Sequence, residues 1–375
     1  MRKFILQVHL WIGLVAGAVL SVVGITGSLY VFQPELTAAL YPHLYKATNP
    51  EAAPVDVREV LQQAGRQFGK EVVTVNFPLR KLQNYILKVE GKKEWLFFDA
   101  TTGKYLGEME QRRGVLDTIL EIHRTLTVGE TGSVITGACA LLLAFVLLSS
   151  GIMLWFPRKK RQLKDGLRLK PKASFKRRNY DLHSVTGFYV SIPLFIIAVT
   201  GAYFAFPVQT QQAVNTLTLT TRPEPDPKTL KSAYQAAVPA MNVYQALDLM
   251  ESMYGSYHKR YLILPKDSVG YVYFSYTNQV EVGAGTQQRP AVYLDQYTAE
   301  ILYAYDPADA PLGHRVTKNW FVPLHFGEVG GYITRVFWFL LGLVPAMLWV
   351  TGILIWLGRK RKRKITVRTG NKAVA

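Results

Sequence analysis

Residues 8–32 read VHLWIGLVAGAVLSVVGITGSLYVF, an apolar run without Asp, Glu, Lys or Arg. Its single histidine, His9, lies near its beginning. A helix of about 20 apolar residues crosses the hydrocarbon core of a bilayer, so this run predicts a transmembrane helix. Arg2 and Lys3 precede the run, as they would in a signal peptide. The run is too long for that and no small-residue cleavage site closes it, so we expect an uncleaved first helix.

A second run, DLHSVTGFYVSIPLFIIAVTGAYFAF at 181–206, repeats the same layout with His183 near its beginning. In both runs a glycine follows the histidine at four residues, and a Thr-Gly pair places another glycine 18 residues after it. These glycines are Gly13 and Gly27 in the first run and Gly187 and Gly201 in the second. The shared spacing predicts that the chain contains one unit twice.

Two further apolar runs predict an α-helical membrane protein with four transmembrane helices. The predicted segments are helix 1 (1–32), a first external module (33–131), helix 2 (132–157), a basic loop (158–180), helix 3 (181–206), a second external module (207–331), helix 4 (332–357) and a basic tail (358–375). The exits of helices 2 and 4 share a glycine followed four residues later by a tryptophan: Gly151 and Trp155, Gly352 and Trp356. We therefore expect two parallel repeats, each made of a helix, an external module and a helix.

Charge sets the predicted orientation. The N-terminus carries two basic residues, residues 157–178 carry eleven and residues 359–372 carry eight, whereas Asp165 is the one acidic residue in these stretches. All three stretches fall on one side of a four-helix arrangement, which is the positive-inside pattern and places both termini in the cytoplasm. Basic runs directly beside helix ends favour a lipid surface as partner and give no indication of nucleic-acid binding.

The two external modules contain similar phrases, FFDATTGKYLGE at 97–108 and VYLDQYTAEILYAY at 292–305, in which Asp99 corresponds to Asp295. Each phrase reads as strand, turn and strand, and a helical stretch precedes each. The pattern predicts that each module is a helix followed by a β-hairpin.

The repeat also predicts how the histidines lie. His9 and His183 should face each other near the cytoplasmic side, and His123 and His325, which precede helices 2 and 4, should form a second pair near the external side. Two opposed imidazoles in an apolar bundle suit an iron porphyrin held from both faces, which predicts two b-type haems. Gly13 and Gly187 would let a flat ring approach the backbone, and Arg124 and Arg335 could meet its carboxylates.

The remaining histidines, His43, His258 and His314, have no partner in the pattern and are expected on the surface. The sequence contains no H-E-x-x-H cluster, which would indicate a zinc site. It also contains no Gly-rich nucleotide-binding motif, so any electron donor must be a separate cytoplasmic molecule. The single cysteine, Cys139, indicates neither a disulfide nor a Cys-based metal site.

These motifs resemble those of the PepSY-associated transmembrane proteins. The phrases at 97–108 and 292–305 resemble the PepSY module, and the His-x-x-x-Gly helices, the LHF phrase at 324–326 and the Gly-x-x-x-Trp exits resemble the family's membrane helices. The resemblance implies a multi-pass protein of the bacterial inner membrane. It implies a dihaem reductase that passes electrons to a periplasmic ferric siderophore, with His9, His183, His123 and His325 as iron ligands.

Two other functions stay open on the sequence. A non-redox scaffold would use the external modules to bind a protein partner, and its histidines would be structural. A permease would carry a metal or siderophore along the central axis, but the spans hold almost no ionisable residues at mid-depth, where transport pathways usually show them.

Overall fold

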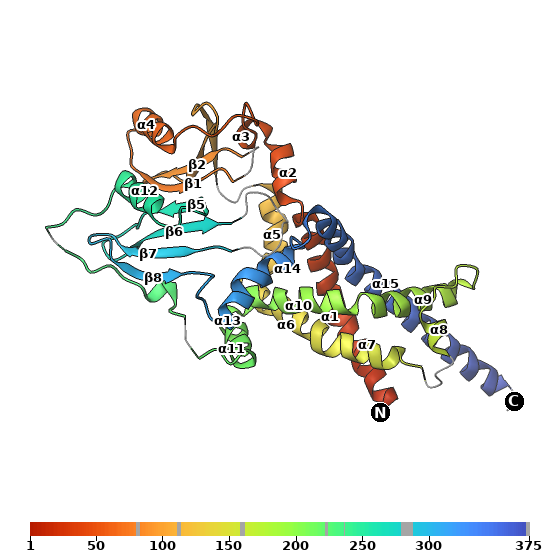
Figure 1. The fold of residues 1–375 in the computed structure, drawn as a ribbon. Helices are drawn as coiled ribbons and strands as arrows, with labels where there is room; N and C mark the ends of the chain where they lie inside the picture. The colour runs from red at the N-terminus through yellow and green to blue at the C-terminus, as the bar shows by residue number, and fades with distance from the viewer. Residues whose placement is uncertain are drawn as a thin grey trace.

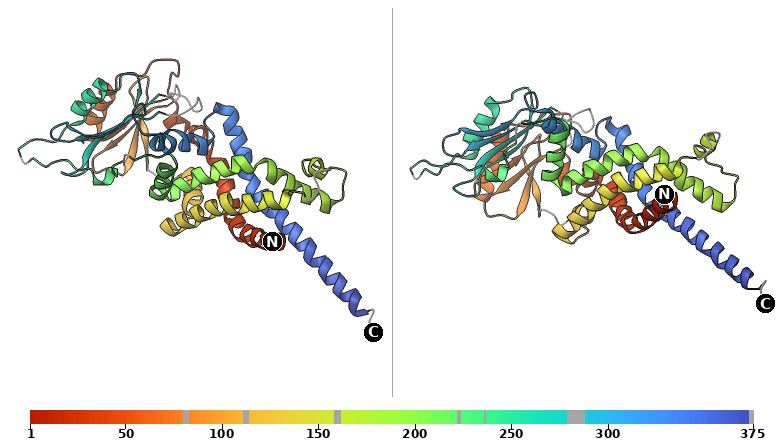
Figure 2. Two further views of the ribbon diagram at one scale, coloured as in Figure 1. Left: turned by 60° about the horizontal axis from the view of Figure 1, so that its bottom comes forward. Right: turned by 90° about the horizontal axis from the view of Figure 1, so that it is seen from below.

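The computed structural model describes residues 1–79, 83–110, 114–157, 162–221, 224–235, 237–278 and 288–372, with side chains as far as residue 359. Residues 158–161 of the predicted basic loop and 373–375 of the predicted tail lie outside the described residues. Long helices form one end of the molecule and a β-sheet forms the other (Figure 1). Two further views show the sheet beyond the ends of the helices, on the side away from the N-terminus (Figure 2).

Three stretches of helix are long and apolar enough to cross a membrane: α1 (Arg2–Tyr30), the continuous α6–η1–α7 (Gly129–Trp155) and residues Gly331–Arg359 of α15 (Gly331–Lys372). The second stretch consists of α6 (Gly129–Leu141), the π-helical η1 (Leu142–Leu147) and α7 (Leu148–Trp155). Helices α9 (Phe175–Tyr189) and α10 (Ser191–Ala205) satisfy the same criterion only as a pair. The described chain therefore has three candidate spans, or four if this pair is one span.

The predicted helix 3 is not straight, because α9 and α10 meet at an angle of 63°. The break lies at Val190, three residues before Pro193. Proline has no N–H to donate to the carbonyl four residues earlier, and its ring crowds that carbonyl, so a helix kinks just before it. The sequence contained this signal, but its apolar character alone predicted a single helix over 181–206.

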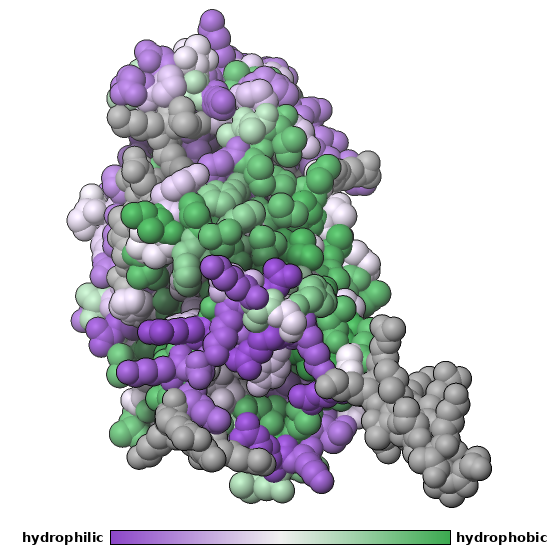
Figure 3. Space-filling model, turned by 90° about the vertical axis from the view of Figure 1, so that its right-hand side faces the viewer, coloured by the Kyte–Doolittle hydropathy of each residue, from purple (hydrophilic) through white to green (hydrophobic). Residues whose placement is uncertain are grey.

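Large apolar side chains are exposed on all of these helices, among them Val15, Phe145, Ile192 and Leu340. Seen from the helical end, hydrophobic side chains cover a broad area that borders a group of hydrophilic ones (Figure 3). A water-soluble protein rarely exposes so much continuous apolar surface, whereas lipid would cover it.

Small residues let α1 and α15 cross at close range. A Cβ atom on Gly24 would lie 2.2 Å from the carbonyl oxygen of Gly342, and one on Gly17 would lie 2.7 Å from Cδ1 of Trp349. Ser28 donates a hydrogen bond to the carbonyl of Phe339 at 2.8 Å. Close backbone approach of this kind is the usual basis of helix association in membranes.

The strands form one antiparallel sheet of eight in the order β4-β3-β2-β1-β5-β6-β7-β8. The strands are β1 (Val72–Asn76), β2 (Tyr85–Val89), β3 (Glu94–Phe98), β4 (Tyr105–Glu110), β5 (His258–Ile263), β6 (Tyr271–Thr277), β7 (Ala291–Asp295) and β8 (Ile301–Tyr305). The predicted helix-and-hairpin modules are thus wrong in extent, since each half contributes four strands. The two halves also join, because β1 pairs with β5 through Val75 and Leu262.

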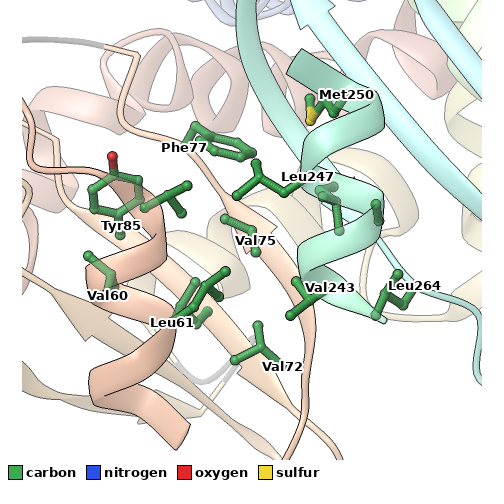
Figure 4. Close-up of a cluster of buried hydrophobic side chains, with 14 of the residues drawn as sticks. Val60, Leu61, Val72, Val75, Phe77, Tyr85, Val243, Leu247, Met250 and Leu264 are labelled. Carbon is green, nitrogen blue, oxygen red and sulfur yellow. The ribbon is translucent and has the colours of Figure 1, made fainter. Parts of the chain in front are cut away.

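Helices α4 (Val57–Phe68) and α12 (Val243–Ser252) cover one face of this sheet and share a single hydrophobic core. Figure 4 shows Leu61 of α4 and Leu247 of α12 on either side of Val75. Shorter helices connect these elements: α2 (Gln33–Leu40), α3 (Pro42–Tyr45), α5 (Val115–Thr125), α8 (Leu163–Gly166), α11 (Pro207–Leu217), the 3-10 helix η3 (Pro227–Thr229), α13 (Leu312–Arg315), the π-helical η4 (Val316–Phe321) and α14 (Val322–Phe326).

Asp99 and Asp295 hold the same turn in the two halves of the sheet. Asp99 Oδ1 accepts from the N–H groups of Thr101 and Thr102 at 2.9 and 2.8 Å, and its Oδ2 accepts from the N–H of Thr48 at 2.7 Å. Asp295 repeats this with Tyr297, Thr298 and Ala233 at 2.8, 3.0 and 2.7 Å. Burial alone would raise the pKa of both carboxyl groups. Hydrogen bonds from the hydroxyls of Thr48 and Thr101, together with the N–H bonds, bring the pKa of Asp99 below its ordinary value, and the N–H bonds do the same for Asp295.

The turn after each aspartate contains a residue with positive φ, which is a glycine in the first half and an alanine in the second. Gly103 and Ala299 both adopt positive φ, at 68° and 61°, where a Cβ is strained. We expect Gly103→Ala to lower the free energy of unfolding by about 0.5–1 kcal/mol and Ala299→Gly to raise it by a similar amount. Thermal unfolding of the purified protein in one detergent measures both. Shifts of the same sign in the two variants would contradict this explanation.

The aspartates predict a pH dependence. Because the pKa of Asp99 is lower in the folded than in the unfolded chain, its ionisation stabilises the fold above about pH 4, and this stabilisation is lost as the pH falls further. Asp99→Asn places an amide donor where the carboxylate accepts, and should lower the free energy of unfolding at pH 7 by roughly 1–3 kcal/mol. The difference from wild type should shrink in unfolding experiments below pH 4, whereas Glu300→Gln, at an exposed position, should behave as wild type at every pH.

Candidate functional site

The structure places four histidines in two pairs. The ring centres of His9 on α1 and His183 on α9 are 6.3 Å apart, with the rings at 84° to each other. Those of His123 on α5 and His325 on α14 are 6.2 Å apart, with the rings at 53°. The predicted pairing of these residues is therefore confirmed.

The two pairs lie at opposite ends of α1. His9 is near its beginning, and Gly27, which lies against His123, is 18 residues further on. Eighteen residues make five turns and a rise of about 27 Å, so both positions share one face of the helix. This rise is close to the thickness of the hydrocarbon core, about 30 Å.

Each ring of the first pair is held by the helix that follows it in its own half of the chain. His9 Nδ1 lies 2.8 Å from the hydroxyl of Ser150, and the carbonyl of Leu147 faces the same ring. His183 Nδ1 lies 3.0 Å from the carbonyl of Leu348 and 3.0 Å from the hydroxyl of Thr351.

The second pair repeats this arrangement on the other two helices. His123 Nδ1 lies 2.8 Å from the carbonyl of Val23 and 3.4 Å from the hydroxyl of Thr26. His325 Nδ1 lies 3.2 Å from the carbonyl of Ile197 and 3.2 Å from the hydroxyl of Thr200. In all four cases the carbonyl comes three residues before the hydroxyl.

A glycine directly after each hydroxyl residue makes room for the ring. A Cβ on Gly27 would lie 2.7 Å from Cε1 of His123, and one on Gly201 would lie 3.1 Å from Cε1 of His325. The corresponding distances are 3.4 Å from Gly151 to His9 and 3.4 Å from Gly352 to His183. We call each set of carbonyl, hydroxyl and glycine a holding triplet: Val23/Thr26/Gly27, Leu147/Ser150/Gly151, Ile197/Thr200/Gly201 and Leu348/Thr351/Gly352.

The holding triplets determine where each imidazole carries its proton. A carbonyl oxygen can only accept, so the ring atom facing it, Nδ1, must be the donor. The adjacent hydroxyl fits the same assignment, because Ser150 donates to the carbonyl of Val146 and Thr351 donates to that of Met347, leaving their oxygens to accept. A neutral ring with its proton on Nδ1 carries its lone pair on Nε2, which is the form in which histidine binds a metal.

These residues fit an iron porphyrin held from both faces. Two imidazoles on opposite sides of one metal, with metal–nitrogen bonds of about 2.0 Å, separate their ring centres by roughly 6 Å. Ordinary ring pairs cover the same separation, about 4.5–7 Å, so the proton position is the stronger argument. Among the described residues no group of three or more His, Cys, Asp or Glu could hold a metal ion.

The other predicted site residues are placed differently. Gly13 and Gly187 do not contact the imidazoles, since the nearest atoms to a Cβ there are leucine carbons at 3.7 Å. Arg335 is buried in a two-pronged ion pair with Glu35, at 2.6 and 2.7 Å, so its charge is balanced within the protein. Arg124 follows His123 and is exposed. A role for either arginine toward haem carboxylates stays a prediction.

The prediction for the other three histidines is confirmed in two cases. His43 and His258 are exposed, whereas His314 in α13 is 3% exposed and therefore belongs to the interior. The hydroxyl residues of the holding triplets were missed as a set. Each of the four predicted helices contains a Ser-Gly or Thr-Gly pair, but helices 2 and 3 contain two each, so the pairs alone did not single out the contacting hydroxyls.

Comparison with known protein families identifies the family of this chain. A family described as "PepSY-associated TM region" matches residues 6–359, which includes all four histidines and all four holding triplets. Comparison with curated proteins finds no match to the chain. The candidate spans and the family together show a multi-pass membrane protein with PepSY modules. The chain belongs to the family of PepSY-associated transmembrane proteins.

Proposed function

We propose that this protein is a b-type haem protein of the bacterial inner membrane that transfers electrons to a ferric siderophore outside it. One haem would be held by His9 and His183, and the other by His123 and His325. The observation that carries this proposal is the arrangement of the four imidazoles, two opposed pairs in which every Nδ1 faces a hydroxyl or carbonyl oxygen of another helix.

In this reaction the haems would carry the electrons, and the protein would hold and orient them. A haem supplies an iron that accepts and releases one electron. The histidines hold that iron, the holding triplets keep their lone pairs directed to it, and the helices exclude water around it. Conversion of Fe(III) to Fe(II) in the siderophore takes one electron per ion, and an oxygen-rich chelator binds the resulting softer ion more weakly.

The proposed orientation follows from charge and from the sheet. The described parts of the basic stretches, residues 162–178 and 359–372, lie at the helical end with the N-terminus, away from the sheet (Figure 1). Positive-inside topology would place that end in the cytoplasm, where a separate reductant supplies electrons near His9. The eight-stranded sheet would then lie in the periplasm, on the side from which a siderophore arrives.

We further propose that the chain is built from two parallel repeats with four spans. The correspondence of the contacts supports this. His9 and His183 are held by helices that follow them in the chain, and His123 and His325 by helices that precede them. The bent pair α9–α10 would then be the counterpart of the straight α1.

The first test is the visible spectrum of the purified protein, oxidised and dithionite-reduced, with haem counted per chain. We expect about two haems per chain and the sharp reduced band of six-coordinate b-type haem. His9→Ala should remove one haem and His123→Ala the other, because an iron held by one imidazole is bound less firmly. His43→Ala and His258→Ala, at exposed positions, should retain both. A colourless protein from haem-replete cells would contradict the proposal and favour the scaffold.

The second test measures whether electrons cross the membrane from the inside to the outside. In sealed vesicles with a reductant inside and a ferric siderophore outside, we expect Fe(II) to appear outside, trapped by an impermeant Fe(II) chelator. His9→Ala and His123→Ala should each abolish it, since both pairs are needed to cross the bilayer. If iron instead entered vesicles that contain no reductant, the protein would be a permease.

A further inference from the structure

In the proposed function the four hydroxyl residues of the holding triplets only help to orient the histidines, and each contacts one histidine of a different helix. We propose that Thr26, Ser150, Thr200 and Thr351 are positioning residues, and that each lowers the reduction potential of the haem whose histidine it contacts without affecting the other. This inference rests on the proposed function, because it concerns the same two sites.

The same contact occurs at all four histidines. Serine and threonine in a helix commonly donate to the carbonyl four residues earlier and need no further partner. All four hydroxyls make that bond, including those of Thr26 and Thr200 at 2.7 Å. Their oxygens nevertheless lie 2.8–3.4 Å from a histidine Nδ1 in every case.

The hydroxyl oxygen, as a second acceptor for Nδ1–H, changes the basicity of the histidine ring. A hydroxyl whose own hydrogen is committed to a carbonyl can only accept from Nδ1–H, and the carbonyl of the triplet accepts as well. Two acceptors on Nδ1–H increase the basicity of Nε2, and a more basic ligand stabilises ferric over ferrous iron. Removing the hydroxyl leaves the carbonyl in place, so the tautomer and the haem should survive while the potential rises.

Each of two helical segments supplies a histidine to one site and a hydroxyl to the other. Helix α1 supplies the ligand His9 to one site and the hydroxyl of Thr26 to the other, where it contacts His123. In the same way the α9–α10 pair supplies His183 to the first site and Thr200 to the second. A purely structural role of Thr26 in α1 would disturb both sites, whereas the proposed role concerns only the His123/His325 site.

The test is a redox titration of the two haems followed by their visible spectra and by electron paramagnetic resonance of the ferric state. Thr26→Val and Thr200→Val should shift the ferric–ferrous equilibrium of the His123/His325 haem toward ferrous by about ten-fold, or about 59 mV for one electron. Ser150→Ala and Thr351→Val should do the same to the His9/His183 haem. The same titration in the His9→Ala background, which retains one haem, assigns the signals.

Two controls separate tuning from packing. Ser149→Ala removes a neighbouring hydroxyl that bonds only to the carbonyls of Phe145 and Val146, and should move neither potential. Thr26→Ser retains the hydroxyl and should therefore retain the wild-type reduction potential. Equal shifts at both haems, or no shift with both haems retained, would overturn this inference and leave the proposed function intact. A wild-type protein without haem would overturn both.

Discussion

The hydrogen bond from a histidine Nδ1 to a main-chain carbonyl of another helix constrains this structure more than any other contact. Inside a bilayer no water can replace such a partner, and a buried donor left without one costs about 1–3 kcal/mol. These contacts fix which helices must touch: α1 must meet both α5 and η1, while α9 must meet α15 and α10 must meet α14. The glycines of the holding triplets are the steric condition for these contacts, because a side chain at Gly27 would occupy the space of the imidazole.

The sheet adds a second constraint at the other end of the molecule. Each half alone would be a four-stranded sheet with β1 or β5 as an open edge, and exposed edges invite unwanted pairing. Pairing β1 with β5 removes both edges and joins the two halves through one hydrophobic core under α4 and α12. The halves are therefore tied together twice, by the sheet and by the histidine pairs.

The parts of this structure that a local pattern or the internal repeat marks could be predicted from the sequence, and the contacts that neither marks could not. The apolar runs and the repeated His-to-Gly spacing predicted the helices and the pairing of His9 with His183. The corresponding turns at Asp99 and Asp295 were predicted as well. The joining of β1 to β5 was not, because Val75 and Leu262 are far apart in the chain and nothing local specifies their pairing. The role of Ser150 was missed for the same reason: a serine in a span usually bonds to its own helix, and only the fold shows that His9 lies beside it.

The spacing of 18 residues in α1 explains why the two sites can share a helix. At about 3.6 residues per turn, 18 residues complete five turns, so a ligand at one end and a holding triplet at the other face the same side. A shift of one residue would rotate one site by about 100° relative to the other and separate His9 or Thr26 from its partner. The second half keeps the same count although α9 and α10 meet at 63°, so there the bend, not the helix period, sets the direction of Thr200. The spacing and the bend are thus two solutions to one requirement, that a single apolar segment serve a histidine pair at each end.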